Sequence, residues 1–336
     1  MTSNAFITAI DRPEVVTPKE QANRSNGRSA QLGNIGFVGL GHMGTAMAAN
    51  LFAAGYGVTA YVRSPGKMKE LAALGLKPTT RLADLFGSSI VVSMLPDDNA
   101  VSEIVFGRSP LGVDGLASGL ERGAIHLSMS TISTSMASLL AHEHAKRGQG
   151  YVAAPVFGNP DAAKARELFI VTAGDPADVE RCRALTDSLG QRTFMVGSDP
   201  AQANLIKLLG NMLSATAIET LGEAVALLLK RGIDPKPFVR IVTSTMFGGR
   251  AHRIYGDKIV SESYAPGFVI PLALKDVRLA LNEADMAGAP MPSVRVVQDR
   301  MLAGIAHGHS GLDWSALGLI AKEEAGLAGT GTPTAN

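Results

Sequence analysis

Residues 34–44 have the sequence NIGFVGLGHMG, in which a short apolar run is followed at once by a glycine-rich turn. The run 35–38 has the composition of a buried strand, and the residues after 44 have that of a helix. Gly39, Gly41 and Gly44 have the G-x-G-x-x-G spacing, which serves a tight turn, close approach of a pyrophosphate and close helix packing. Free amides at the helix start would face the phosphates. The stretch therefore predicts a dinucleotide-binding unit, and a tight turn without a ligand is the alternative.

Strand-like and helix-like segments alternate beyond this turn. We expect strands at 35–38, 58–62, 90–95, 124–127, 151–153, 168–171 and 193–196, with helices such as 43–54 and 135–147 between them. This alternation is typical of crossover units in a mostly parallel sheet. From 202 to 231 the sequence is a single helical run without proline, and helices are expected at 235–242, 272–288, 292–306 and 314–325. The predicted fold is α/β, a Rossmann-type doubly wound sheet followed by an all-α domain that a long interdomain helix joins to it.

The same pattern suggests where the domains begin and end. We expect a flexible extension at 1–33, a nucleotide-binding domain at 34–198, an all-α substrate and dimerisation domain at 199–327 and a flexible tail at 328–336.

Composition excludes several classes of protein. The chain has 336 residues, 46% of them hydrophobic and 18% charged, and a net charge of +1. Such a balance is ordinary for a globular protein and argues against nucleic-acid binding. No run of about 18 uncharged apolar residues is present, so we expect no membrane span. The single cysteine, Cys182, cannot form an internal disulfide, which fits the reducing cytoplasm. No Cys/His cluster has zinc spacing, so we expect a small-molecule partner and no metal.

The end of the second expected strand indicates which dinucleotide is bound. A site for NAD carries an acidic residue about 20 residues after the glycine turn, where it accepts the ribose hydroxyl. Here the sequence reads Tyr61-Val62-Arg63-Ser64, followed by Lys67. Arg63 and Ser64 are suited to bind a 2′-phosphate through charge-assisted hydrogen bonds. The prediction is NADP(H), and the alternative is that Arg63 and Lys67 are solvated surface charges.

Residues 39–58, GLGHMGTAMAANLFAAGYGV, resemble the opening signature of the β-hydroxyacid dehydrogenase family, to which 6-phosphogluconate dehydrogenase and imine reductases are more distantly related. The resemblance extends from 34 to about 325, because further family-like motifs follow in order. It implies a nicotinamide-dependent oxidoreductase that interconverts a small carbonyl compound and its hydroxy acid, and a homodimer or tetramer formed through the helical domain. The expected cofactor contacts in this part of the chain are Gly39, Leu40, Gly41, His42, Met43, Gly44, Leu95 and Pro96.

The second motif is the hydroxyl-rich segment 128–133, SMSTIS, which is similar to the family segment beside the nicotinamide and substrate. It follows an expected parallel strand, at the edge where open α/β sheets bind ligands. We expect Ser130 to bind substrate and Thr131 to contact both substrate and cofactor. The alternative, which does not exclude this role, is a cap for the next helix.

The third motif, 153–159 or AAPVFGN, stands where the family has DAPVSGG to hold the substrate carboxylate. Phe157, Gly158 and Asn159 are the expected substrate contacts. Ala153 replaces the aspartate and Phe157 the substrate-binding serine. If Phe157 faces the pocket it favours a larger or less polar substrate, and the alternative is that it packs into the core.

The fourth motif is 201–211, AQANLIKLLGN, which resembles the catalytic helix of the family. Lys207 and Asn211 are four residues apart, so they project from one face of the helix, and the neighbours of Lys207 are apolar. Partial burial would lower the pKa of Lys207 toward the working range of an acid/base group. The resemblance makes Lys207 and Asn211 the catalytic pair, whereas alone Lys207 could simply extend from an amphipathic helix. Gly210 occupies a position that often carries a second asparagine.

The last motif, 268–280, resembles the family's Lys-Asp-Leu segment near the cofactor, with Lys275 as the contact to the nicotinamide half. Neighbouring Lys275 and Asp276 should not face each other on a helix, so an ordinary surface pair is the alternative. Together the motifs predict an NADPH-dependent reductase or dehydrogenase. An imine reductase acting on C=N bonds is the nearest alternative, and a nucleotide-sensing module without catalysis is an alternative of another class.

Overall fold

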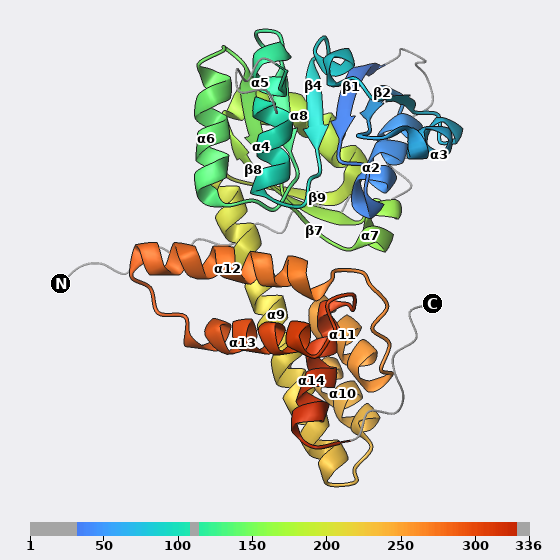
Figure 1. Ribbon diagram of the computed structural model, residues 1–336, viewed down its shortest axis with the longest axis vertical. Helices are drawn as coiled ribbons and strands as arrows, with labels where there is room; N and C mark the ends of the chain where they lie inside the picture. The colour runs from blue at the N-terminus through green and yellow to red at the C-terminus, as the bar shows by residue number, and fades with distance from the viewer. Residues whose placement is uncertain (1–31, 108–113, 328–336) are drawn as a thin grey trace, which may run out of the picture.

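The computed structural model describes residues 32–107 and 114–327. In this part of the chain a nine-stranded sheet with its covering helices precedes a group of helices (Figure 1). The first strand begins at Leu32, two residues before the expected start of the nucleotide-binding domain. The rest of the expected extension and the expected tail lie outside the described residues.

The sheet has the order β3-β2-β1-β4-β5-β6-β8-β7, with β9 pairing with β8. Neighbouring strands from β3 to β6 run parallel, β8 is antiparallel to β6 and β7, and β9 is parallel to β8. The strands are β1 Leu32–Val38, β2 Tyr56–Tyr61, β3 Lys77–Thr79, β4 Ile90–Ser93, β5 Ile125–Ser128, β6 Gly150–Ala153, β7 Val156–Phe157, β8 Leu168–Gly174 and β9 Gly190–Gly197. The predicted doubly wound sheet is confirmed. The sequence did not predict β3 and β7, because two or three residues are too few to show a period.

Alternation along the strands supplies apolar side chains to both faces of the sheet. On β1, Ile35 and Phe37 pack into the cluster with helices α2 (His42–Ala53) and α8 (Pro176–Leu189), whereas Val38 packs on the other side with Leu85 and Leu116. That second face is covered by α4 (Asp98–Phe106), α5 (Leu116–Gly119) and α6 (Thr134–Ala145). Shorter elements complete this half: η1 Pro65–Lys67, α3 Met68–Ala73, η2 Leu82–Leu85 and α7 Pro160–Lys164.

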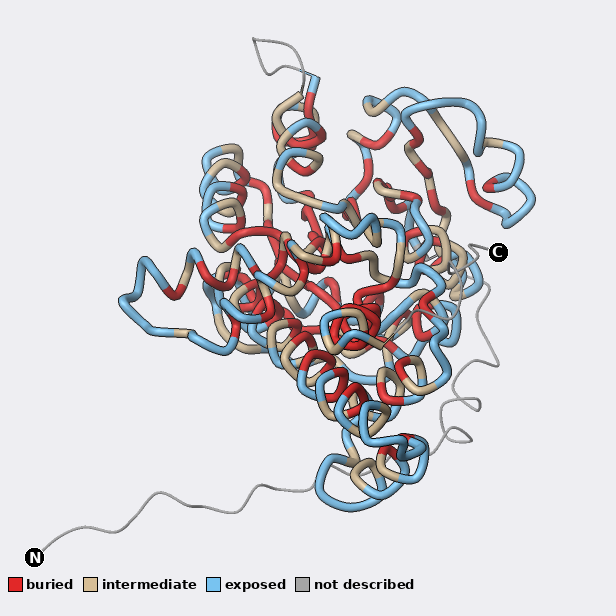
Figure 2. Tube along the Cα trace, turned by 60° about the horizontal axis from the view of Figure 1, so that its bottom comes forward, coloured by how far each residue is buried: buried red, intermediate tan, exposed pale blue. Residues whose placement is uncertain are grey.

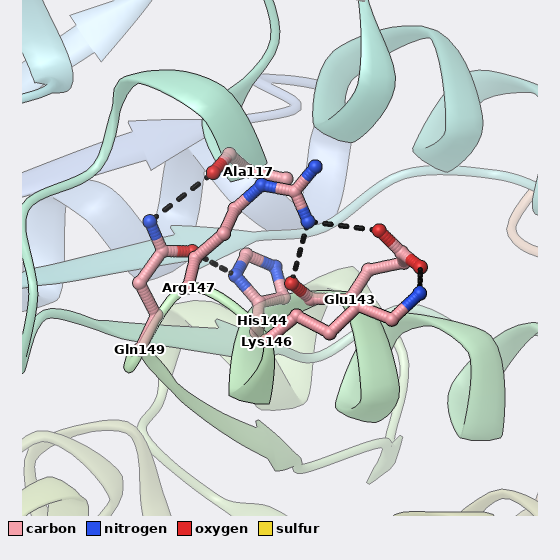
Figure 3. A network of polar contacts seen from close by, with 6 residues as sticks. All are labelled: Ala117, Glu143, His144, Lys146, Arg147 and Gln149. Atoms are coloured by element: carbon pink, nitrogen blue, oxygen red, sulfur yellow. Dashed lines mark hydrogen bonds and ion pairs between the residues drawn. The ribbon is translucent and has the colours of Figure 1, made fainter.

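A buried chain of polar side chains lies under the second face. His126 on β5 contacts the Ser93 hydroxyl at 2.8 Å through Nε2 and His144 at 3.1 Å through Nδ1. His144 in turn lies 2.7 Å from Gln149 Oε1, and Gln149 donates to the Ala117 carbonyl (Figure 3). Gln149 also donates to the Leu120 carbonyl. Both imidazoles are fully buried and cannot bond to bulk water. Each of their ring nitrogens instead has a hydrogen-bond partner within the protein.

The second half of the described chain is entirely helical. The long helix α9 spans Pro200–Lys230, close to the predicted 202–231, and its first turn is capped by the Asp199 side chain, which accepts from the Ala201 amide at 3.0 Å. The other elements are α10 Pro235–Ser244, α11 Arg250–Val260, α12 Ile270–Ala287, α13 Pro292–Ala306, η3 Trp314–Ala316 and α14 Leu317–Glu324. Helix α11 was not predicted, because its sequence RAHRIYGDKIV is polar and contains a glycine.

Helix α9 connects the two halves (Figure 1). It packs against β6, β8 and α6 on one side of the molecule and against α11, α12, α13 and α14 on the other. By length and composition alone it is apolar enough to cross a membrane, although the sequence predicted no such span. Many of its residues are buried in these helix and sheet contacts, whereas Leu213 and Leu227 are exposed, and Figure 2 shows buried backbone running through the interior of the molecule. The residues of its first three turns therefore lie between the sheet and the helices.

Candidate active site

The glycine turn after β1 has the geometry that a dinucleotide requires. Gly39 has φ +91°, and a side chain there would collide with the Met94 carbonyl oxygen. A side chain at Gly44 would collide with the Gly39 carbonyl oxygen. Around Gly41, by contrast, no heavy atom lies within 4 Å of the position a Cβ would take. Because no protein contact in the described chain explains Gly41, the second glycine of the motif, its lack of a side chain fits a ligand that approaches the backbone at the start of α2.

The other expected cofactor residues lie along the same edge of the sheet. His42 is exposed at the first position of α2, with Leu40 buried and Met43 half-buried beside it. Arg63 and Ser64 are exposed just after β2, and Lys67 Nζ donates to the Leu40 carbonyl at 3.2 Å. Leu95 and Pro96 follow β4. All these residues stand at the carboxyl ends of parallel strands, where open α/β sheets bind their ligands.

A chain of four polar side chains joins α9 to α12. Lys207 Nζ donates to Asn211 Oδ1 at 2.7 Å, and Asn211 Nδ2 donates to Asp276 Oδ2 at 2.6 Å. Asp276 Oδ1 is 3.0 Å from Lys275 Nζ. Lys207 is 7% exposed and Asp276 only 2%. The predicted pair of Lys207 and Asn211 is therefore oriented by a buried carboxylate from a helix that lies 65 residues further along the chain.

Burial changes the acid strength of the central group. Removal from water lowers the pKa of Lys207 to about 8, the Asp276 carboxylate opposes this change, and the positive charge of Lys275 adds to it. An ammonium group with such a pKa gains and loses its proton near neutral pH, as acid/base catalysis requires.

Lys275 and Asp276 form an ion pair, as expected if Asp276 is the orienting neighbour of Lys275, although helix geometry argued against direct contact. Adjacent residues on a helix point in different directions, yet the flexible Lys275 side chain curls back to the buried Asp276 carboxylate. Lys275 Nζ also donates to the Thr131 carbonyl at 2.5 Å, which links α12 to the loop after β5. The expectation that the two would not face each other was therefore wrong. The sequence signal for Asp276 was an acidic residue within the mostly apolar helix segment 269–281.

The expected substrate residues divide into two groups. Ser130 is fully buried, and its hydroxyl accepts from the Leu95 amide at 2.8 Å, so it joins two loops rather than facing solvent. Asn159 caps α7 by accepting from the Ala162 amide at 2.9 Å. Thr131 is half-buried beside Lys275, and Gly158 is exposed at φ +147°. The capping role considered for segment 128–133 belongs to Ser133, which accepts from the Met136 amide at 3.0 Å.

Phe157 lies next to the lysine. Its ring centroid is 4.4 Å from Lys207 Nζ, and its side chain is half-buried against the cluster of the second sheet face. Both interpretations of Phe157 are thus partly correct. The ring packs against the core, and one of its faces lies against the Lys207 ammonium in the candidate site.

Other reactive groups lie away from this chain of side chains. His307, His309 and Glu323, near the ends of α13 and α14, bring possible metal-ligand atoms within 4.8 Å of one another, although no metal site was expected. Each imidazole already hydrogen-bonds to that carboxylate, at 2.9 and 3.0 Å. Burial raises the pKa of Cys182 to about 12, which makes it an unreactive thiol at neutral pH.

The comparisons with known proteins agree with this geometry. Residues 34–197 match the family model for the NAD-binding domain of 6-phosphogluconate dehydrogenase. Residues 201–319 match the family model described as NAD-binding of NADP-dependent 3-hydroxyisobutyrate dehydrogenase. An uncharacterized oxidoreductase of Bacillus subtilis is 39% identical over 84% of this chain and 98% of its own, and 2-hydroxy-3-oxopropionate reductase of Escherichia coli is 31% identical over 84% and 95%.

Solved structures share the fold. That of 3-hydroxyisobutyrate dehydrogenase from Salmonella typhimurium superposes with a TM-score of 0.77 at 22% identity, over 85% of this chain and 99% of that one. An imine reductase of Streptomyces aurantiacus superposes with a TM-score of 0.57 at 22% identity, over 84% and 98%.

A dinucleotide turn, a helical second half and a buried lysine between them define a nicotinamide-dependent oxidoreductase that acts on CH–OH groups and the corresponding carbonyls. More particularly, the chain belongs to the β-hydroxyacid dehydrogenase family.

Proposed function

We propose that this protein is an NADPH-dependent reductase or dehydrogenase that interconverts a small aldehyde or keto acid and its hydroxy acid, with Lys207 as general acid/base. One observation carries the proposal: the Lys207 ammonium is buried between the sheet and α12, bonded to Asn211, with a pKa of about 8.

The residues of the chain perform separate tasks in this reaction. The bound nicotinamide supplies or accepts the hydride. Lys207 Nζ faces the substrate oxygen, stabilises the charge that develops on it, and donates its proton to that oxygen in the direction of reduction. Asn211 holds the lysine amine in place, and Asp276 fixes the Asn211 amide through its 2.6 Å hydrogen bond. Thr131 and the Gly158 backbone orient the other end of the substrate.

The preference for NADPH rests on basic groups beside the glycine turn. Arg63 and Ser64 follow β2 where an acidic residue would serve NAD, and Lys67 reaches over the turn to the Leu40 carbonyl. These groups supply donors and positive charge for a 2′-phosphate.

Replacement of Lys207 tests the proposed role directly. Lys207→Ala should lower kcat for reduction by about 10²–10⁴-fold, because the proton donor is lost. NADPH binding, followed by fluorescence, should be almost unchanged, since Lys207 contacts Asn211 and the Phe157 ring rather than the residues expected to bind the 2′-phosphate. Glu180→Ala, on the exposed side of α8, is a control for surface substitution. Native turnover in Lys207→Ala would refute the role.

Reduction of imines is the second candidate function. Ala153 and Phe157 replace the polar residues of the family motif, which makes the adjoining subsite less polar, and imine reductases share the fold. Assays of NADPH oxidation with glyoxylate, succinic semialdehyde and a cyclic imine separate the two candidates. Turnover of the imine alone would favour the imine reductase.

We also propose that the protein acts as a homodimer or tetramer built on α9. Leu213 and Leu227 of this helix are each 65% exposed, although the helix is otherwise used for packing. Large exposed apolar side chains on one long helix are suited to contact with a second copy.

A further inference from the structure

Two residues that differ from the family pattern, Phe157 and Gly210, contact each other in the structure. Phe157 is the second residue of β7, and Gly210 lies on α9, 53 positions away in sequence. A side chain at position 210 would overlap with Cε1 and Cζ of the Phe157 ring. The ring therefore occupies the space that any larger residue at 210, such as the asparagine of the family motif, would need.

The ring is held between Gly210 and the proposed proton donor. Positions 207 and 210 are neighbours on the same side of α9, three residues apart. The ring centroid is 4.4 Å from Lys207 Nζ, so one part of the ring contacts the helix backbone and its face lies toward the ammonium. Because Phe157 also packs in the buried cluster of the second sheet face, rotation of the ring away from Lys207 would break that packing.

This arrangement removes hydroxyl donors that could bind an anionic substituent beside Lys207. The serine hydroxyl of the family motif is absent at position 157, and the Ser130 hydroxyl is fully buried and bonded to the Leu95 amide. A carboxylate placed against the ring would lose water and gain no hydrogen-bond donor from the ring itself. An alkyl or aryl group would bury apolar surface at the same place.

We propose that Phe157, seated on Gly210, is a specificity-determining residue that makes the enzyme prefer aldehydes with an uncharged apolar substituent over their carboxylate counterparts. This inference rests on the proposed function, since it assumes that the substrate carbonyl is reduced beside Lys207, and it changes the preferred product from a hydroxy acid to the alcohol of an apolar aldehyde. Gly210 acts indirectly, as the residue that gives the ring its position.

The test compares two aldehydes of the same shape and different charge. Succinic semialdehyde ends in a carboxylate, and 4-methylpentanal carries an isopropyl group in its place. With NADPH, the native enzyme should show a kcat/KM for 4-methylpentanal at least 10-fold above that for succinic semialdehyde. Phe157→Ser, which restores a hydroxyl, should shift this ratio by at least 10-fold toward the carboxylate. Gly210→Ala keeps the aromatic residue but displaces the ring, and should shift the ratio in the same direction by a smaller factor.

Controls separate specificity from folding. Phe194→Ser removes an exposed phenylalanine of β9 and should leave the ratio unchanged. Circular dichroism confirms that each variant is folded, and if Phe157→Ser is not, Phe157→Leu and Gly210→Ala carry the test. A native preference for succinic semialdehyde, or an unchanged ratio in the folded variants, would overturn the inference and leave the proposed function standing. Turnover of neither aldehyde, with NADPH still bound, would overturn both.

Discussion

Burial lowers the pKa of Lys207, and Asp276, which is linked to that residue through Asn211, opposes this change. The Asp276 charge raises the pKa of Lys207, which burial and Lys275 lower to about 8. Reduction requires the protonated amine, so kcat/KM for reduction should fall above about pH 8, and oxidation of the alcohol should rise through the same range. Asp276→Asn removes the opposing charge while keeping a polar side chain, and should move both midpoints to lower pH.

The measurement is the pH profile of both reaction directions, followed by NADPH absorbance. Asp161→Asn, an exposed position on α7, provides a matched control that should leave the midpoints in place. Unchanged midpoints in Asp276→Asn would show that the carboxylate does not act on the proton donor.

Arg63 is the residue on which the cofactor preference depends. A charge-assisted hydrogen bond contributes about 1.5–3 kcal/mol, so Arg63→Ala should weaken NADPH binding by roughly 10–100-fold. NADH lacks the 2′-phosphate, and its affinity should barely change. Fluorescence titration with both cofactors measures the two constants. Equal losses for both would mean that Arg63 serves some other part of the dinucleotide.

At the scale of the elements, the His126–His144 chain connects β5, α6 and α5 under the sheet and makes the fold sensitive to acid. Burial lowers the pKa of His144 to about 4 and that of His126 well below its usual value. Unfolding restores pKa values near 6.5, so below that pH the unfolded chain binds more protons than the folded one. The free energy of unfolding should therefore fall from about pH 6.5 toward pH 4, by up to about 1.4 kcal/mol per pH unit for each imidazole.

Denaturant titrations at several pH values measure this slope. His144→Gln removes one of the two buried imidazoles and should flatten the dependence, whatever it does to stability at neutral pH. His142→Gln, on the exposed side of α6, should keep the native slope. A slope that is the same in all three proteins would assign the acid sensitivity to other groups.

At the scale of the whole molecule, helix α9 has one face buried in the interior and another face exposed on the surface. The face with Lys207 and Asn211 is buried, whereas Leu213 and Leu227 are exposed. If a second copy covers this surface, light scattering after gel filtration should give at least twice the mass of the chain, and Leu213→Asp should lower it toward that of a monomer by burying an unpaired charge. Ala184→Asp, at an exposed position of α8 away from this surface, is the comparison. A native monomer would contradict the proposed assembly.

Much of the fold follows from local sequence patterns. The seven expected strands are all present within a few residues, and α9 begins two residues before its predicted start. Segments with a full period and an identifiable start or end could be predicted because hydrophobic alternation and capping act between near neighbours. The strand β7 and helix α11 could not, because one is too short and the other too polar.

The sequence by itself determined the order of strands and helices, the glycine turn, and the placement of Lys207 and Asn211 on one helix face, since all of these depend on residues close together in the chain. Only the tertiary structure decided that Asp276 orients Asn211, that Ser130 is buried, and that Phe157 rests on Gly210 beside the lysine. Those contacts join residues dozens of positions apart, and they exist because α9 packs against the sheet at one end and against α12 further along.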